Sequence, residues 1–364
     1  MTIRSIITSF LIKTCERIML LFTLFNFELN DETFLYSVFG TIISVFLLVD
    51  LGFFNKSAHK ISTKSALYQS IFWVVISTMF GFLVYKMGPF EIEEDGKILS
   101  VSGLDASVEY FSAYLTEYAL SVDNIFVILL ILKFFKVKEQ YFHKVLFWGI
   151  LGAVFFRGIF IFVGAILIHH FHAILYVFGV FLIYSGIKIY FDDGDEKIDP
   201  EKNPILKFCR KYLPITKDEM GGQFLAKVNG KFMFTPLFLV IVLIETTDLI
   251  FAVDSIPAAF AITTNEFIIY TSNIFAVMGL RAMFFLLSGV IDKFYLLQKG
   301  LSVILFFIGA KMLLEIGKGS DVLPETLTDM PPTLSFIIII ITLTLSIVFS
   351  VLIPQKNKES DELS

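Results

Sequence analysis

The most restrictive feature of this sequence is its division into long apolar runs. Hydrophobic residues make up 56% of the 364 residues, Phe alone occurs 43 times, and only 17% of the residues are charged. The apolar residues come in blocks of about 20, which is the length of one helix across a bilayer. A helix suits that environment because it satisfies its own backbone polar groups in lipid. The sequence therefore predicts an all-α polytopic membrane protein.

Nine transmembrane helices are expected. Their ranges are 34–54, 66–87, 110–133, 145–168, 172–191, 234–263, 267–290, 298–316 and 334–353. Residues 1–33 are amphipathic with charges near the middle, which predicts an N-terminal interfacial segment before a transmembrane domain at 34–353. A loop at 192–233 with mixed charge and prolines is expected to be a cytoplasmic linker with some helix. Residues 354–364 are expected to be a disordered tail.

The basic residues of the loops predict the orientation. Segments that follow odd-numbered spans hold 20 of the 29 Lys and Arg residues, so the N-terminus is expected outside and the C-terminus in the cytoplasm. No basic domain suited to nucleic acid is present. Two distant cysteines, Cys15 and Cys209, indicate no disulfide framework. No catalytic constellation is found either, so neither enzyme chemistry nor an organic cofactor is expected.

The third and sixth spans carry related acidic motifs. In "TEYALSVDNIF", Glu117 precedes Asp123 by six residues; in "TDLIFAVDSIP", Asp248 precedes Asp254 by the same distance, 131 residues further on. The next spans match through Arg157 and Arg281, and the spans after those through "YSGIKIY" and "FIGAKML", which place Lys188 against Lys311 and Gly186 against Gly309.

Three matches in the same order predict an internal repeat. Residues 108–191 and 234–316 each contain three spans. Because three is odd, the second copy enters the membrane from the opposite side. An inverted 3+3 repeat of this kind is a transporter architecture, with the binding site expected near the bilayer midplane.

The intramembrane acids, which also include Glu245, allow three interpretations. A charged residue at a helix centre costs about 2.5–3.5 kcal/mol on insertion scales, so each acid needs a partner. The acids could form structural salt bridges with the charge-balancing Arg157, Arg281 and Lys311. They could form a proton relay. They could also bind a hard divalent cation, because carboxylate, amide and hydroxyl oxygens are its preferred ligands. Asn124 and Ser255, next to the key aspartates, would add neutral oxygens.

Helix geometry limits how these acids could share one ion. Residues six apart differ by about 120° in direction and about 9 Å along the axis. Either the helices are broken, or each pair serves two positions along a path. Pro257 favours a break in the sixth span, because it removes the bond that the Val253 carbonyl would accept. Glu245 and Asp248, three residues apart, share a face and form the more compact chelating pair.

The motifs "EYALSVDN" and "ETTDLIFAVDSIP" resemble the paired signature of the TerC/Alx family of bacterial integral membrane proteins, and "LLVDLGFFNK" resembles that family's first span. The resemblance covers roughly 34–316. It implies the bacterial inner membrane and metal-ion homeostasis, with manganese export in the Alx-like branch. By position, the family's acidic sites would be the residues Asp50, Glu117, Asp123, Glu245, Asp248 and Asp254. Asp50 by itself reads as a membrane-boundary residue.

These observations lead to a main functional hypothesis and one alternative. The main hypothesis is a divalent cation transporter that most favours manganese as its substrate, with protonation of the same carboxylates coupling transport to the proton gradient. The alternative is a non-transporting membrane partner that supplies metal to exported enzymes or supports tellurite resistance.

Overall fold

The fold was obtained as a computed structural model, which describes residues 31–54, 63–94, 97–171, 173–191, 203–216, 222–228, 230–288, 295–316 and 330–352. The chain divides into two compact units, residues 1–48 and 49–364, and each is considered by itself. The helices are α2 (Asp31–Phe54), α3 (Thr63–Met87), α4 (Gly103–Phe134), α5 (Glu139–His170), α6 (Ile174–Phe191), α7 (Pro204–Tyr212), α8 (Pro236–Phe260), α9 (Glu266–Leu287), α10 (Tyr295–Ile316) and α12 (Pro332–Leu352). The strands are β1 (Phe90–Glu94), β2 (Lys97–Val101), β3 (Leu225–Val228) and β4 (Lys231–Phe234).

The nine predicted spans fall on nine of these helices. Within the described residues, eight helices are long and apolar enough to cross a membrane: α3, α4, α5, α6, α8, α9, α10 and α12. The ninth, α2, contributes a shorter apolar stretch, Thr33–Val49. The prediction of an all-α polytopic membrane protein is confirmed.

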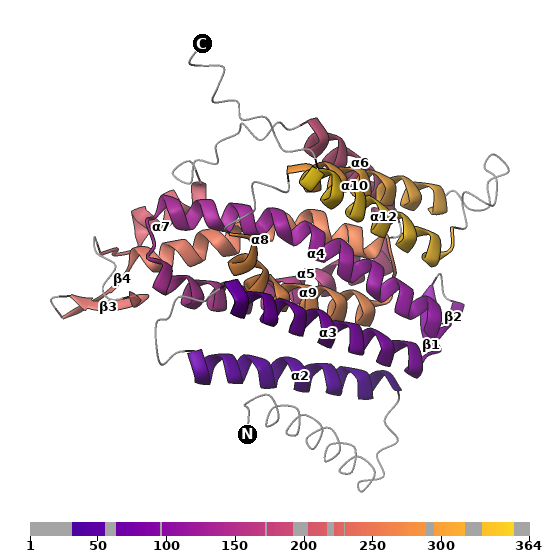
Figure 1. The fold of residues 1–364 in the computed structure, drawn as a ribbon, viewed down its shortest axis with the longest axis horizontal. Helices are drawn as coiled ribbons and strands as arrows, with labels where there is room; N and C mark the ends of the chain where they lie inside the picture. The colour runs from indigo at the N-terminus through magenta and orange to yellow at the C-terminus, as the bar shows by residue number, and fades with distance from the viewer. Residues whose placement is uncertain are drawn as a thin grey trace, which may run out of the picture. The chain divides into compact units, whose positions relative to one another are not determined.

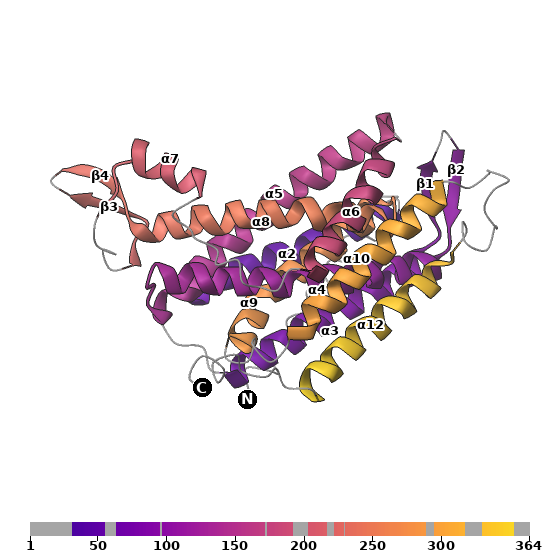
Figure 2. The same cartoon turned by 90° about the horizontal axis from the view of Figure 1, so that it is seen from above.

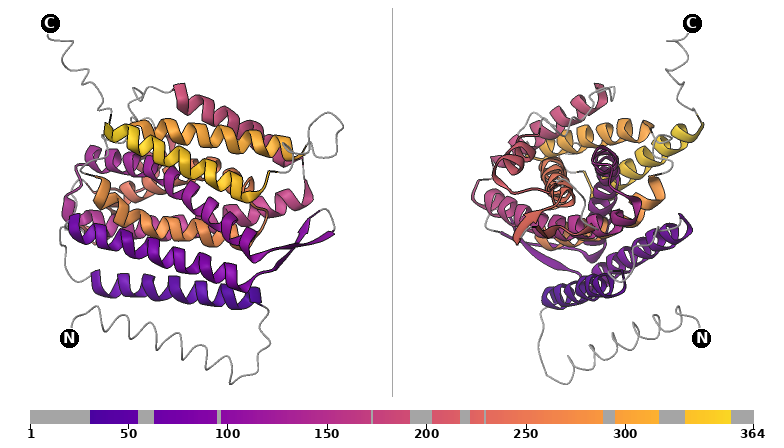
Figure 3. Two further views of the ribbon diagram at one scale, coloured as in Figure 1. Left: turned by 45° about the vertical axis from the view of Figure 1, so that its right-hand side comes forward. Right: turned by 90° about the vertical axis from the view of Figure 1, so that its left-hand side faces the viewer.

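In the second unit, α9 is the central helix (Figure 1). It packs against α3, α4 and α5, and almost all of its residues from Phe267 to Phe284 are buried. On another side of the bundle, α6 packs along α10, and α12 packs on α10 and α4 (Figure 3). Two of these helices have a side-chain N-cap. Ser102 accepts a backbone N–H in the first turn of α4, and Asn265 accepts one in the first turn of α9, both at 3.2 Å.

The crossing of α6 and α10 depends on glycines. A methyl group on Gly186 would stand 2.7 Å from the Ser302 carbonyl oxygen, and one on Gly309 would stand 2.7 Å from the Gly179 carbonyl oxygen. Gly186 and Gly309 occupy equivalent positions in the predicted repeat, as do Gly179 and Ser302. Exchanging the two halves would therefore interchange these two contacts. The inverted repeat as a whole stays a prediction, and this pair of contacts agrees with it.

Two antiparallel hairpins lie at opposite ends of the helices, β1–β2 at one end and β3–β4 with α7 at the other (Figure 2). The second hairpin and α7 occupy the predicted loop 192–233, which therefore contains a short helix, as expected, and strands that were not expected. The predicted interfacial segment up to residue 30 and the predicted tail 354–364 lie outside the described residues.

The predicted break at Pro257 is wrong. Helix α8 is continuous from Pro236 to Phe260, and beyond the proline the Pro257 carbonyl accepts the Ala261 N–H at 2.9 Å. Pro257 lies in the last turn and is buried, so the missing donor removes only one bond near the helix end. Helix α4 is continuous as well. Of the two arrangements that the acid spacing allowed, the path with separate positions is the one compatible with this structure.

Candidate functional site

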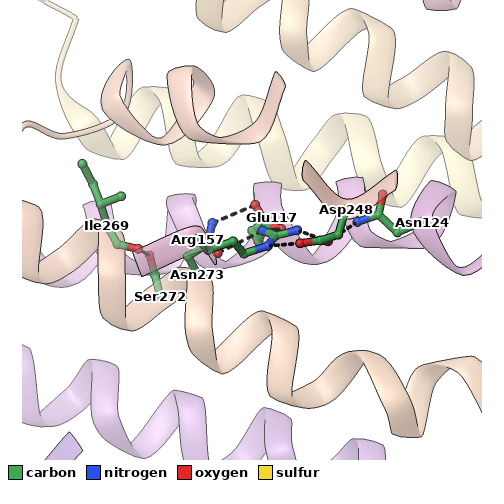
Figure 4. A network of polar contacts seen from close by, with 7 residues as sticks. All are labelled: Glu117, Asn124, Arg157, Asp248, Ile269, Ser272 and Asn273. Atoms are coloured by element: carbon green, nitrogen blue, oxygen red, sulfur yellow. Dashed lines mark hydrogen bonds and ion pairs between the residues drawn. The ribbon is translucent and has the colours of Figure 1, made fainter. Parts of the chain in front are cut away.

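One arginine holds two acids from different spans. Arg157, in the middle of α5, is 0% exposed. Its Nη1 pairs with Glu117 of α4, while Nη2 and Nε donate to the two carboxylate oxygens of Asp248 on α8 at 2.9 and 3.2 Å. The planar guanidinium fork suits such bidentate contact with a carboxylate. Figure 4 shows the guanidinium between the two acids.

Two amides extend this network. Asn273 of α9 accepts from Arg157 Nη1 at 3.0 Å and donates to Glu117 Oε2 at 2.9 Å. Asn124 of α4 donates from Nδ2 to Asp248 Oδ1 at 3.4 Å (Figure 4). Asn273 is a site residue that the sequence analysis missed. The available signal was an amide within a mainly apolar span, at the position equivalent to Gly149 in the predicted repeat.

A small cavity adjoins this network between α4, α5, α8 and α9. Its volume is about 30 Å³, which is enough for a water-sized guest. Asn124, Thr247 and Asp248 provide its polar lining, and Gly149 lines it from α5 without a side chain. The Oδ1 atom of Asn124 is buried and has no hydrogen-bond partner among the described residues.

Glu245 lies one turn before Asp248 on α8, and its carboxylate points towards α5. Both of its carboxylate oxygens are buried, with no hydrogen-bond partner in the described part of the chain. The carboxylate lies directly over Gly152, where any side chain would collide with it, and Oε1 is 3.9 Å from where a methyl group on Gly149 would stand. Glu245 and Gly152 both line a mainly apolar groove of about 1020 Å³ along α5 and α8. The residues on either side of Glu245 in this part of α8, Ile244 and Thr247, line the small cavity. The two members of the predicted chelating pair therefore differ: Asp248 is bound by Arg157, whereas Glu245 has no hydrogen-bond partner among the described residues.

The second acid of the α8 motif is held elsewhere. Asp254 accepts a hydrogen bond from Ser185 of α6 at 2.8 Å, and the buried hydroxyl of Ser255 has no partner among the described residues. Lys311 is buried in α10 and Arg281 is partly buried in α9. The side chains of Asp50 and Asp123 lie outside the described parts. Within those parts, no three Asp, Glu, His or Cys side chains are already grouped to hold a metal ion.

The comparison with known families agrees with these motifs. The family described as "Integral membrane protein TerC family" matches residues 102–358, which is more than half of the chain. The chain belongs to the TerC family. The matched region contains the whole Arg157 network, the small cavity and both acidic motifs, and the chain is a multi-pass integral membrane protein.

Three bacterial relatives illustrate the similarity. The "Uncharacterized membrane protein STKORF319" of Myxococcus xanthus is 38% identical over 328 residues, covering 90% of this chain and 95% of the relative. The "Putative membrane-bound redox modulator Alx" of Escherichia coli K12 is 40% identical over 281 residues, covering 77% and 85%. A membrane protein of Rickettsia bellii is 42% identical over 275 residues, covering 76% and 86%. No solved structure matches the chain.

Proposed function

We propose that this TerC family protein carries a divalent cation, with manganese favoured, through its polar centre. This centre consists of the Arg157 network, the small cavity beside it and Glu245, between α4, α5 and α8. The observation that supports the proposal best is a set of buried oxygen atoms with no hydrogen-bond partner among the described residues: Asn124 Oδ1 and both Glu245 carboxylate oxygens. Further along α8, next to Asp254, the Ser255 Oγ atom is buried in the same way. Burying such groups unpaired costs roughly 1–3 kcal/mol each on protein scales. A hard cation would bind oxygens of these types.

The charges of the centre also suit a divalent ion. Glu117, Asp248 and Glu245 are three acids, whereas Arg157 is the one base that the described contacts place among them. With all three acids ionised, the cluster carries two uncompensated negative charges. A single divalent cation would neutralise them, and two protons would do the same. The same site could therefore exchange a cation for protons, which is the proposed coupling.

Arg157 has a defined part in this proposal. Its guanidinium binds the Asp248 carboxylate, and Asp248 lines the small cavity. A cation that enters the cavity must therefore compete with the guanidinium for this carboxylate. When Asp248 is released, Arg157 keeps Glu117 and Asn273 as partners. The arginine is then a counter-ion that alternates with the cargo, and Glu245 and Asn124 are the ligands that are free to receive it. Export is the direction implied by the family resemblance.

A flux assay tests this proposal. Purified protein is reconstituted in liposomes that contain a dye quenched by manganese, with and without a pH gradient. We expect manganese-dependent quenching that the pH gradient stimulates and that competing calcium, magnesium or zinc reduces to different extents. Glu245→Gln and Asn124→Leu should each lower the rate at least tenfold. Glu245→Gln should leave thermal unfolding unchanged, because the carboxylate it replaces has no described partner to lose.

Thr246→Val is the matched control. Thr246 is the neighbour of Glu245, but its hydroxyl donates only to the Val242 carbonyl of its own helix, at 2.7 Å, so flux should stay near the wild-type rate. Unchanged flux in both Glu245→Gln and Asn124→Leu would remove these residues from the pathway. A wild-type protein without manganese flux would instead favour the non-transporting metal partner.

A further inference from the structure

The helix α7 and the β3–β4 hairpin form a small cap at one end of the bundle (Figures 1 and 2). Leu206 and Cys209 of α7 are buried in the same apolar cluster as Leu237 and Val240 of α8. The hairpin is joined to α8 through Thr235 alone, and the Thr235 hydroxyl donates to the Gln223 carbonyl at 2.6 Å. The cap is therefore fixed directly to a membrane-crossing helix.

The outer surface of this cap exposes large apolar side chains. Phe208 and Tyr212, one turn apart on α7, are each 61% exposed, and their ring centroids are 4.6 Å apart. On the hairpin, Phe232 is 71% exposed and Leu225 is 51% exposed. The strand register pairs Leu225 with Phe234 and Lys227 with Phe232, which puts all four on one face of the hairpin.

Basic side chains alternate with these aromatic residues. Lys207, Arg210, Lys211, Lys227 and Lys231 are all exposed. The described residues of 203–234 include no Asp or Glu; the two acids of this segment, Asp218 and Glu219, lie outside them. The charges are also close to the rings: Lys227 Nζ is 5.9 Å from the centre of the Phe232 ring, and Lys211 Nζ is 5.3 Å from that of Tyr212. The surface is thus both aromatic and cationic.

We infer that the outer surface of the cap binds the anionic headgroups of phospholipids at the face of the bilayer. Aromatic side chains favour the depth of the headgroups, and an amphipathic element with a basic polar face binds there. Each Lys or Arg near an anionic surface raises partitioning about fivefold. The bilayer is within reach because the cap continues directly into α8. The sequence also predicts this end of the bundle on the cytoplasmic side. This inference does not depend on the proposed transport activity.

A tryptophan reporter tests it in the full-length protein. Phe232→Trp is made in a chain whose two native tryptophans, Trp73 and Trp148, are replaced by Phe. The protein is reconstituted in vesicles of phosphatidylcholine alone or mixed with phosphatidylglycerol, each with brominated acyl chains as quenchers. We expect bluer emission and at least twofold stronger quenching with the anionic lipid. Replacing Lys207, Lys211, Lys227 and Lys231 by Gln should abolish that difference.

Replacing Lys64 and Lys86 by Gln is the matched control, because both are exposed on α3 outside the cap; it should leave the difference intact. Emission typical of water in both vesicles would overturn the inference and favour a soluble protein as the partner of this surface. Equal quenching in both vesicles would overturn the headgroup recognition, since the apolar side chains alone would then account for the insertion. High salt should weaken the anionic-lipid effect.

Discussion

Two of the contacts between the predicted halves of the bundle differ in symmetry. At the α6–α10 crossing, Gly186 approaches Ser302 and Gly309 approaches Gly179, which are contacts that an exchange of the halves would interchange. At the polar centre, Arg157 of the first half holds both Glu117 and Asp248, although these acids are themselves equivalent positions of the repeat. One guanidinium that binds both acids cannot obey a two-fold relation.

A second pair of positions makes the same distinction. Gly149 has no side chain and borders the small cavity, whereas its equivalent Asn273 bridges Arg157 and Glu117. The apolar crossing is thus symmetric, whereas at the polar centre one half contributes a glycine where the other contributes an amide. Both properties suit the proposed transport function, because related halves would permit alternation between two faces and an asymmetric centre would define one of its states.

The largest expected effect comes from Arg157, where the asymmetry is concentrated. Arg157→Met leaves two buried carboxylates without their base, which should cost about 3–5 kcal/mol of stability. Arg281 occupies the equivalent position of the predicted repeat and is only partly buried. Arg281→Met should therefore cost clearly less stability. Thermal unfolding of both variants in detergent measures the difference. Equal losses would mean that the two halves rely on their arginines alike and would end the argument for an asymmetric centre.

At the symmetric α6–α10 crossing, equivalent substitutions in the two halves should cost equal stability. Gly186→Ala and Gly309→Ala each bring a methyl group to 2.7 Å from a backbone carbonyl oxygen, so each should cost about 1–3 kcal/mol through overpacking. Gly40→Ala is the control, because nothing lies within 4 Å of the added group; it should be neutral or slightly stabilising. The same unfolding measurement applies, and a large effect of only one of the two α6–α10 variants would contradict the symmetric contact.

Removing the Asn273 amide should cost less stability than removing Arg157, because Arg157 and Glu117 keep each other as partners. Asn273→Ala loses hydrogen bonds of 3.0 and 2.9 Å to Arg157 and Glu117, and a hydrogen bond to a charged group contributes about 1.5–3 kcal/mol. A double-mutant cycle with Glu117→Gln should give a coupling of about 0.5–3 kcal/mol. Additive losses would show that Asn273 acts independently of the acid, and the difference between Asn273 and Gly149 would then carry no meaning for the site.

Much of this organisation could be predicted from sequence, for physical reasons. The spans follow from apolar length, because a helix in lipid is almost the only solution for those runs. The importance of Arg157 follows from the cost of an unpaired charge in an apolar span. The choice of its partners does not follow, since it depends on which helices pack together. Sequence separation alone gives no reason to place Glu117 and Asp248 on the same guanidinium.

The missed elements had a readable local signal. Each hairpin carries a turn dipeptide between its strands, Asp95–Gly96 in the first and Asn229–Gly230 in the second, and both dipeptides favour two-residue hairpin turns. Apolar length alone does not reveal such short strands. Pro257 has a different explanation: the predicted span 234–263 puts it in the helix interior, whereas α8 ends three residues after the proline.

The smallest expected effect concerns the other acid position on α8. Ser185→Ala removes the 2.8 Å hydrogen bond to Asp254, and hydrogen bonds between membrane helices contribute about 0.6 kcal/mol on average. Stability should therefore barely change. If Asp254 is a second position on the cation path, its altered carboxylate should shift the manganese concentration for half-maximal flux while the maximal rate is kept. Ser112→Ala, which loses only a bond to the Val108 carbonyl of its own helix, should shift neither. An unchanged concentration dependence in Ser185→Ala would confine the path to the Arg157 centre, where the asymmetry of the bundle already lies.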